Sequence, residues 1–282
     1  MSYKDVFIFW NHGPIPNDAR PMFRRPTAFL NMGSPPGRHP DFRGSVLALG
    51  HRPIREAIRT KLPGVQPLRI GLLGFSASCS GVRTFLSSAD GGYVDTVICI
   101  DGIHCQSVSY PAVRGGYLGP YVAFGKLAAY GVPPFSNVVA GNRLLAITNS
   151  QADGPPGQDP TSVTTQEITE GILAGYPYIS NTLPEVLYHD PSRHPWTNPA
   201  GRQRWPDGNV TQWGRHTYED PPIEWAVNVG GFYALSYRKV DPTSIGDHRY
   251  QAAVVLPAVV GALAANRWSI IPPEGGVCMV GA

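Results

Sequence analysis

Three side chains that lie far apart in the sequence have the types needed for nucleophilic catalysis: Ser76, a later aspartate and His248. A serine hydroxyl is a weak nucleophile at neutral pH, so it needs an imidazole as base and a carboxylate that orients the imidazole. On a parallel sheet these groups follow in the order serine, acid, histidine, each from a loop at the carboxyl end of a strand. The sequence contains this order, and we expect Ser76 and His248 to meet.

The local sequence around Ser76 predicts a sharp turn between a strand and a helix. An apolar run at 68–73 leads into the motif G-x-S-x-S, and small residues then open a helix expected over 78–88. Such a nucleophile elbow lifts one serine oxygen clear of the sheet. Strand and helix nearly touch there, so small side chains are needed two positions before and after the serine. Gly74 and Ser78 meet this need, although the commonest form of the motif ends in glycine. The alternative is a Gly/Ser-rich turn without chemistry.

His248 is selected from eight histidines. It combines a late position, a Gly-Asp approach loop and a helix behind it, expected from about 250 to 268, in which Pro257 should cause a bend or a break. The other histidines lie before the serine, near the ends of other expected strands or in a long irregular segment. Asp247, beside His248, is expected to shape the loop. The alternative is a surface histidine without a role.

Two aspartates are candidates for the acid that orients His248. Asp153 comes a few residues after a strand expected at 143–148, whereas Asp101 directly ends the strand before it. We favour Asp153, because its offset past the strand end gives the side chain room to bend back toward the histidine. Asp101 is the alternative. If Asp101 is not the acid, we expect it and His104 to hydrogen-bond the loops that form the floor of the pocket.

The elements that must position these side chains alternate between strand and helix. Buried strands are expected at 6–10, 68–74, 94–100, 143–148 and within 226–237, and helices at 53–62, 78–88 and 250–268. The segment 117–130 is ambiguous. This alternation predicts a single α/β domain, 1–282, with a mostly parallel central sheet flanked by helices on both faces.

Residues 154–225 interrupt this alternation with dense Pro, Tyr, Trp, His and Asn and one helix expected near 165–174. A segment of this length with few regular elements is typical of a functional lid. We interpret it as an aromatic, proline-rich insertion over the site. A structural flap with its own small core is the alternative.

Composition excludes several classes of partner. Charged residues make up 15% of the chain and the formal net charge is +3, so there is no basic stripe for a phosphate backbone, and nucleic acid is not an expected partner. No secretory signal is visible at the start, and the most apolar late run, 252–265, is too short and too interrupted to span a bilayer. We therefore expect a soluble protein, cytoplasmic by default.

The cysteines show no metal-ligand spacing, and we expect all four to be free. They are Cys79, Cys99, Cys105 and Cys278. The sequence therefore predicts neither a metal site nor a cofactor.

Taken together, these features resemble the α/β-hydrolase superfamily, in its serine esterase and lipase-like members. The resemblance rests on the G-x-S-x-S motif after a strand, on Asn11-His12-Gly13 after an earlier strand, and on the ordered Asp153 and His248. It implies that Ser76 attacks an acyl carbon, that His248 transfers the proton and that Asp153 or Asp101 holds the imidazole.

The same resemblance implies an oxyanion hole built from backbone N–H groups. One donor would be Ala77, and the other would come from Gly13 or Ile15, because Pro14 has no N–H. The residues expected to contact substrate are His12, Phe75, His104, Trp196 and Trp213.

The expected function is that of a cofactor-free serine hydrolase that cleaves a carboxylic ester, in a small molecule or a polymer, through an acyl-enzyme. Ester is preferred over amide because it is the easier bond to cleave. An amidase or peptidase using the same three side chains is one alternative. A non-catalytic protein that binds a glycan or a partner on this scaffold is the other.

Overall fold

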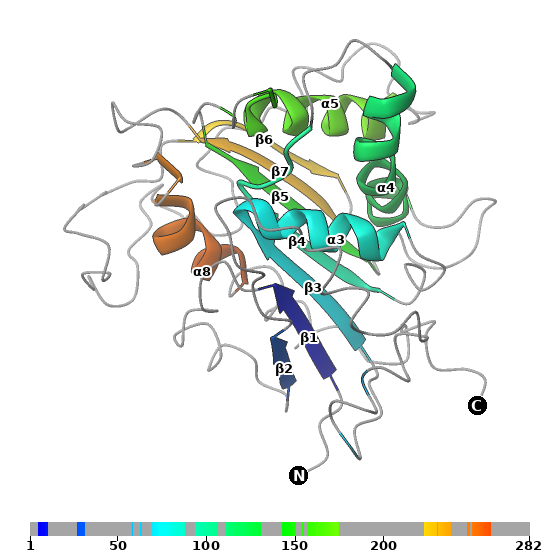
Figure 1. Ribbon diagram of the computed structural model, residues 1–282, viewed down its shortest axis with the longest axis vertical. Helices are drawn as coiled ribbons and strands as arrows, with labels where there is room; N and C mark the ends of the chain where they lie inside the picture. Colours follow the sequence, from blue (N-terminus) through cyan, green and yellow to red (C-terminus); the bar gives the residue numbers. More distant parts are fainter. Residues whose placement is uncertain are drawn as a thin grey trace.

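The fold is organised around a seven-stranded sheet with the order β2-β1-β3-β4-β5-β7-β6 (Figure 1). The computed structural model describes residues 5–10, 27–31, 58, 63, 69–87, 94–105, 111–130, 143–150, 154, 157–174, 223–229, 231–237, 247–248 and 250–260. Its strands are β1 Asp5–Trp10, β2 Thr27–Asn31, β3 Arg69–Phe75, β4 Thr96–Ile100, β5 Leu144–Asn149, β6 Ile223–Val229 and β7 Phe232–Tyr237. Its helical elements are η2 Ser76–Ser78, α3 Cys79–Leu86, α4 Pro111–Tyr130, α5 Thr161–Leu173, η5 Gln251–Val255 and α8 Leu256–Val259.

The expected α/β class with a mostly parallel sheet is confirmed. Every neighbouring pair from β2 to β7 is parallel, and β6 adds an antiparallel edge strand on β7. Every residue of β4 and β5 is buried, and so is every residue of β3 except Phe75 at its end. This burial explains why they read as continuous apolar runs in the sequence, since a parallel sheet is normally covered on both faces.

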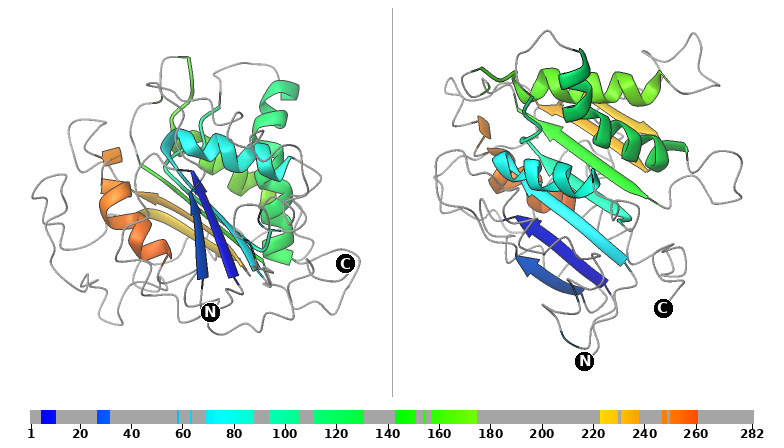
Figure 2. Two further views of the ribbon diagram at one scale, coloured as in Figure 1. Left: turned by 60° about the horizontal axis from the view of Figure 1, so that its bottom comes forward. Right: turned by 45° about the vertical axis from the view of Figure 1, so that its right-hand side comes forward.

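Helices lie on both faces of the sheet. Figure 2 shows α3, α4 and α5 on one side and α8 on the other. Alternate strand residues face opposite sides, and one set joins the helices α3, α4 and α5 in a continuous apolar core. This core includes Leu72, Val97, Cys99, Leu145, Ile147, Val82, Phe85, Tyr121, Phe124, Ile168 and Ile172. On the other face, the ring of Tyr237 lies 6.1 Å from that of Tyr250, just before η5.

The strand order places the end of β3 where the chain changes direction across the sheet. β1 lies between β2 and β3, so the chain leaves β1 toward one edge and leaves β3 toward the other, through β4 and β5. In open parallel sheets, ligands bind beyond the carboxyl ends of the strands at such a switch point. Ser76 is the first residue after β3.

The register of the central strands brings the ends of β4 and β5 opposite the end of β3. Phe75 pairs with Ile100, and Ile100 pairs with Thr148, so these three residues form one row across β3, β4 and β5. Ser76 and Asp101 directly follow the first two. Because neighbouring strands are about 4.8 Å apart, the backbones that carry these two side chains leave the sheet side by side.

Helix α4 resolves the segment 117–130 that was ambiguous in the sequence. It runs from Pro111 to Tyr130 although Gly115, Gly116, Gly119 and Pro120 lie in its first half. These residues disfavour a helix, but its second half buries large side chains against the core. Tertiary packing therefore overrides local propensity here.

Other expectations differ in extent from what is observed. Helix α5 lies within the segment 154–225 and packs on β5 and β7, whereas 175–222 lie outside the described residues. The long helix expected at 250–268 begins with the π-helical η5 and continues as α8, which contains Pro257. Almost all of the helix expected at 53–62 lies outside the described residues.

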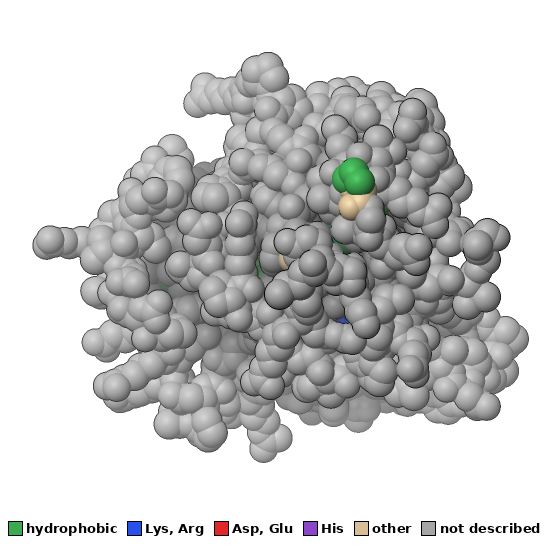
Figure 3. Space-filling view, turned by 90° about the horizontal axis from the view of Figure 1, so that it is seen from below, with side chains coloured by type: hydrophobic (Ala, Val, Ile, Leu, Met, Phe, Trp, Pro, Cys, Tyr) green, Lys and Arg blue, Asp and Glu red, His purple; other side chains and the backbone are tan. Residues whose placement is uncertain are grey.

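The described surface carries little that is apolar. In the space-filling view from below, the visible described side chains form small separate areas (Figure 3). Within the described ranges, the one large hydrophobic side chain that is exposed is Val163. No helix in the described part of the chain is both long and apolar enough to cross a membrane.

Candidate active site

Ser76 occupies a strained turn between β3 and α3. Phe75 before it has extended backbone angles, φ −123° and ψ 137°, whereas Ser76 has φ 56°. That left-handed value is unusual for a residue with a side chain and costs of order 1–3 kcal/mol. The chain then makes one 3₁₀ turn and enters α3 at Cys79. Ser76 is half-buried.

Gly74 and Ser78 explain why the motif needs small residues. A Cβ on Gly74 would lie 2.9 Å from the Cα of Cys79 and 3.0 Å from a methyl of Val82, so strand and helix could not approach so closely. The buried Ser78 hydroxyl accepts a hydrogen bond from the Phe75 N–H at 2.6 Å and donates one to the Phe75 carbonyl. Ser78 therefore fastens the helix to the strand end, which a glycine could not do.

Two neighbouring elements hold the turn from outside. A Cβ on Gly102, just beyond β4, would lie 2.0 Å from the Ser76 carbonyl oxygen, so this loop rests directly on the turn. The buried Tyr121 of α4 donates its hydroxyl to the Cys79 carbonyl at 2.6 Å. The strained conformation at Ser76 is therefore enforced by packing on two sides.

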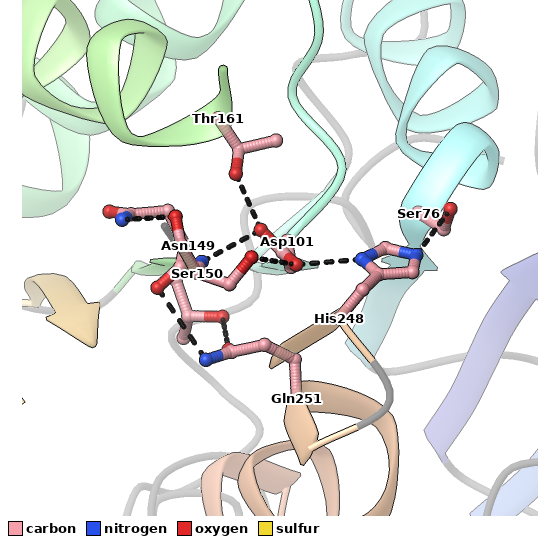
Figure 4. A network of polar contacts seen from close by, with 8 residues as sticks. Ser76, Asp101, Asn149, Ser150, Thr161, His248 and Gln251 are labelled. Carbon is pink, nitrogen blue, oxygen red and sulfur yellow. Dashed lines mark hydrogen bonds and ion pairs between the residues drawn. The ribbon is translucent and has the colours of Figure 1, made fainter. Parts of the chain in front are cut away.

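Three side chains form a continuous hydrogen-bonded relay at the carboxyl edge of the sheet (Figure 4). The Ser76 Oγ lies 2.8 Å from the His248 Nε2, and the His248 Nδ1 lies 2.7 Å from the Asp101 Oδ2. The side chain of His248 is 30% exposed and that of Asp101 is 1% exposed. The relay therefore runs from a sealed carboxylate to a half-buried hydroxyl.

Asp101 is buried with its carboxylate fully hydrogen-bonded. Oδ1 accepts from the Ser150 N–H at 2.8 Å and from the Thr161 hydroxyl at 2.5 Å. Oδ2 accepts from the Ser150 hydroxyl at 2.7 Å and faces the His248 Nδ1. These four partners match the accepting capacity of an ionised carboxylate. Its backbone is also left-handed, with φ 43°.

The surroundings keep Asp101 charged. Burial on its own would raise the pKa of this carboxyl, but the hydrogen bond and charge of His248, with the donors from Ser150 and Thr161, lower the pKa below that of an ordinary aspartate. An ionised carboxylate only accepts hydrogen bonds, so the proton of a neutral His248 ring is assigned to Nδ1. Nε2 then accepts from the Ser76 hydroxyl, which is the arrangement that a general base requires.

The orientation of His248 is set by its neighbours on two sides. The ring of Phe75 stacks on the imidazole, with centroids 4.8 Å apart and planes 22° from parallel. Three residues after the histidine, the buried Gln251 accepts a hydrogen bond from Thr148 at 2.8 Å. This bond ties the segment that carries the base to β5.

The structure brings together some of the predicted site residues. Ser76, His248 and the alternative acid Asp101 meet, and the favoured acid Asp153 lies outside the described residues. Phe75 stacks on His248, and Ala77 directly follows Ser76. His104 is half-buried, and its N–H bonds the Gly102 carbonyl at 3.0 Å. The predicted residues His12, Gly13, Ile15, Trp196 and Trp213 also lie outside the described residues.

Several residues of this site were missed by the sequence reasoning. Ser150 and Thr161 bond the carboxylate, Gln251 anchors the segment of the base and Gly102 supports the turn. Their positions could have indicated this role, because Ser150 directly follows β5 and Thr161 is the first residue of α5.

The described side chains do not gather around a metal. Within the described ranges, no three His, Cys, Asp or Glu residues converge as ligands. Cys79, Cys99 and Cys105 are free and buried, as predicted, and Cys278 lies outside the described residues.

Comparison with known proteins identifies no relative. No family model, no curated protein and no solved structure matches this chain. The function of this chain is therefore inferred from the geometry of the site.

Proposed function

We propose that this protein is a serine hydrolase that cleaves carboxylic esters through an acyl-enzyme. The observation that carries the proposal is the relay in which the Ser76 Oγ lies 2.8 Å from the His248 Nε2 and the opposite ring nitrogen lies 2.7 Å from Asp101. Nucleophile, base and orienting acid are the three roles that acyl transfer by a serine requires.

The proposed reaction begins when the Ser76 Oγ attacks the acyl carbon while His248 takes its proton on Nε2. The ionised Asp101 stabilises the imidazolium that forms. His248 then donates this proton to the oxygen of the departing alcohol, which leaves the acyl group on Ser76. In the second half, His248 removes a proton from water and the water oxygen attacks the acyl carbon. The bond between the acyl carbon and the Ser76 Oγ then breaks, His248 returns the proton to that oxygen, and the carboxylic acid is released.

The developing negative charge on the acyl oxygen needs backbone donors. The N–H of Ala77, the residue after the nucleophile, is the first proposed donor, as expected for an elbow. Gly13 or Ile15 is proposed as the second, and its position after β1 agrees with the sheet order, in which β1 and β3 are neighbours.

The finer description of the fold belongs to the same proposal. We propose an α/β-hydrolase type of domain in which much of the segment 154–225 acts as a lid over the substrate. It is supported by the parallel sheet, by the strained serine at the end of β3 and by the strand order, which places that serine at the switch point.

A fluorophosphonate probe tests the proposal, because it reacts covalently with an activated serine. We expect the wild type to be labelled once per chain, and Ser76→Ala to lose labelling together with ester turnover by several orders of magnitude. Ser80→Ala, in the first turn of α3, is a control at a nearby serine, and it should be labelled like the wild type. A wild-type protein that stays unlabelled, or one labelled equally after Ser76→Ala, would contradict the proposal.

The class of substrate is tested separately. Short p-nitrophenyl esters are compared with peptide anilides at equal concentration. Faster turnover of the esters supports the esterase, and the reverse result assigns an amidase or peptidase that uses the same three side chains.

A further inference from the structure

We propose that Ser150 and Thr161 are positioning residues that fix the plane of the Asp101 carboxylate and aim its Oδ2 at His248. The acid then comes from the residue directly after β4, whereas the residue directly after β5 and the first residue of α5 hold it in place. The inference rests on the proposed function, and it assigns to two residues a role in that reaction that neither their types nor their spacing predicted.

The need for positioning follows from the torsion of the aspartate side chain. Rotation about the bond that carries a carboxylate is soft, with broad and roughly twofold preferences. One hydrogen bond to His248 leaves the group free to turn about that contact. A second oxygen held by independent donors removes this freedom, so the donors to Oδ1 decide which way Oδ2 points.

Ser150 holds both oxygens at once. Its N–H donates to Oδ1 at 2.8 Å and its hydroxyl donates to Oδ2 at 2.7 Å, which grips the carboxylate edge at two points. The backbone of Asp101 is also held by this chain segment, because the Asp101 N–H donates to the Thr148 carbonyl at 2.9 Å. The end of β5 therefore fixes both the backbone and the side chain of the acid.

Thr161 holds Oδ1 from the first residue of α5. This helix end is itself fastened to the loop after β4, because the Thr164 hydroxyl donates to the Ile103 carbonyl and the Asp159 N–H donates to the Cys105 carbonyl at 2.9 Å. A negative charge is also favourable beside the first turn of a helix. The donor that Thr161 offers is therefore presented by a rigid element.

The surroundings of the Asp101 carboxylate are buried. Asp101, Ser150 and Thr161 are each at most 3% exposed, so no bulk solvent is available to replace a lost donor. His248 and Cys79 are titratable groups that interact electrostatically with Asp101. Burial raises the pKa of the Cys79 thiol, so this group stays neutral. The balance of donors around the carboxylate is therefore set by His248, Ser150 and Thr161.

Four variants of the full chain test the proposal. Thr161→Val and Ser150→Ala each remove one hydroxyl donor, and Thr161→Ser keeps the donor. Thr169→Val is a matched control, because Thr169 is also buried in α5 but donates only to the Thr165 carbonyl of its own helix, at 2.8 Å. We measure kcat and KM for a p-nitrophenyl ester from pH 5 to 9, with active sites counted by fluorophosphonate titration.

The expected result is a fall in kcat of about 10- to 100-fold in Thr161→Val and Ser150→Ala, the range that hydrogen bonds to a charged group can supply. KM should change little. The acid limb of the kcat profile should move to higher pH, because a carboxylate with fewer donors is more basic and the Asp101–His248 pair then holds its proton more strongly. Thr161→Ser should restore both the rate and the profile, and Thr169→Val should match the wild type.

A purely structural role would lower the thermal stability and the count of titratable sites but leave kcat per site and its pH profile unchanged. That result, or an equal effect of Thr169→Val, would overturn the proposal. Its failure is distinguishable from failure of the proposed function, because in the latter case the wild type would not react with the probe. If Thr161→Val does not fold, Thr161→Ala removes the same hydroxyl and takes its place in the comparison with Thr161→Ser.

Discussion

The two ends of the relay are built in opposite ways. Asp101 is 1% exposed and is bound by Ser150 just after β5, by Thr161 of α5 and by His248. Ser76 is half-buried, and its hydroxyl meets His248. Yet both residues have left-handed backbones, and they are the two non-glycine residues with positive φ in the described part of the chain.

The Asp101 carboxylate is held by hydrogen bonds, whereas the turn at Ser76 is held by close packing of the backbone. The carboxylate is sealed and can be fixed by hydrogen bonds, because nothing has to reach it. In the proposed reaction the serine oxygen has to stay accessible to a substrate, and its position is enforced by the tight approach of Gly74 and Gly102 to the turn. Substitutions at Asp101 should therefore change the protonation of the Asp101–His248 pair, and substitutions around Ser76 should change the position of its hydroxyl.

The largest effect is expected at the acid end, from Asp101→Asn. The amide keeps the shape of the carboxylate but no longer favours the proton on the His248 Nδ1, so ester turnover should fall by about 10⁴-fold. The rate per folded molecule measures this. Asp153→Asn is the direct comparison, and a larger loss there would return the acid to the residue that the sequence favoured.

At the serine end, Gly102→Ala should distort the turn. The new methyl group would lie 2.0 Å from the Ser76 carbonyl oxygen and 2.6 Å from the Cys79 Sγ, so backbone must move. Overpacking of this kind costs about 1–3 kcal/mol of unfolding free energy, and the rate of fluorophosphonate labelling should fall with it. Gly116→Ala in α4 meets nothing within 4 Å and should not destabilise the protein. If Gly102→Ala and Gly116→Ala are equally stable, packing against Gly102 does not enforce the turn.

A smaller effect is expected in the acid dependence of stability. The folded pKa of Asp101 is lower than that of an unfolded aspartate, about 3.9. Its contribution to stability is therefore complete above that value and is lost as the pH falls through the lower, folded pKa. Denaturant midpoints from pH 7 to 3 should fall less steeply for Asp101→Asn than for the wild type. A parallel fall in both proteins would show that Asp101 does not contribute.

The smallest effect is expected from the ring that stacks on the base. Phe75→Leu removes the stacking on His248, which is worth about 0.5–1.5 kcal/mol, so kcat/KM should fall by about 2- to 10-fold. Phe75→Tyr keeps an aromatic face and should stay close to the wild type. If the leucine and tyrosine variants are equally impaired, Phe75 acts by contact with substrate and not by orienting the ring.

The sequence predicted what depends on local pattern. Continuous apolar runs located the central strands, and small residues around Ser76 located the turn. The contact between Ser76 and His248, which are 172 residues apart, followed from a rule about strand ends and is present at 2.8 Å.

What the sequence could not supply was the choice among buried polar partners. Asp153 was favoured for its spacing past a strand, whereas the acid that meets His248 in the structure is Asp101. The deciding features are donors on Ser150 and Thr161, which are common small polar residues whose significance depends on tertiary contact. Helix α4 shows the same limit, because its glycines and proline disfavour a helix that packing against the core stabilises.

The row that joins Phe75, Ile100 and Thr148 across three strands also limits how this chain can vary in length. Because side chains alternate between the two faces of a sheet, one residue deleted within 96–100 would send the carboxylate at 101 to the wrong side of the strand. Insertions between helices and strands do not change the number of residues between Thr96 and Asp101. The spacing from Thr96 to Asp101 is therefore expected to stay fixed in any working homologue, however much the connecting segments diverge.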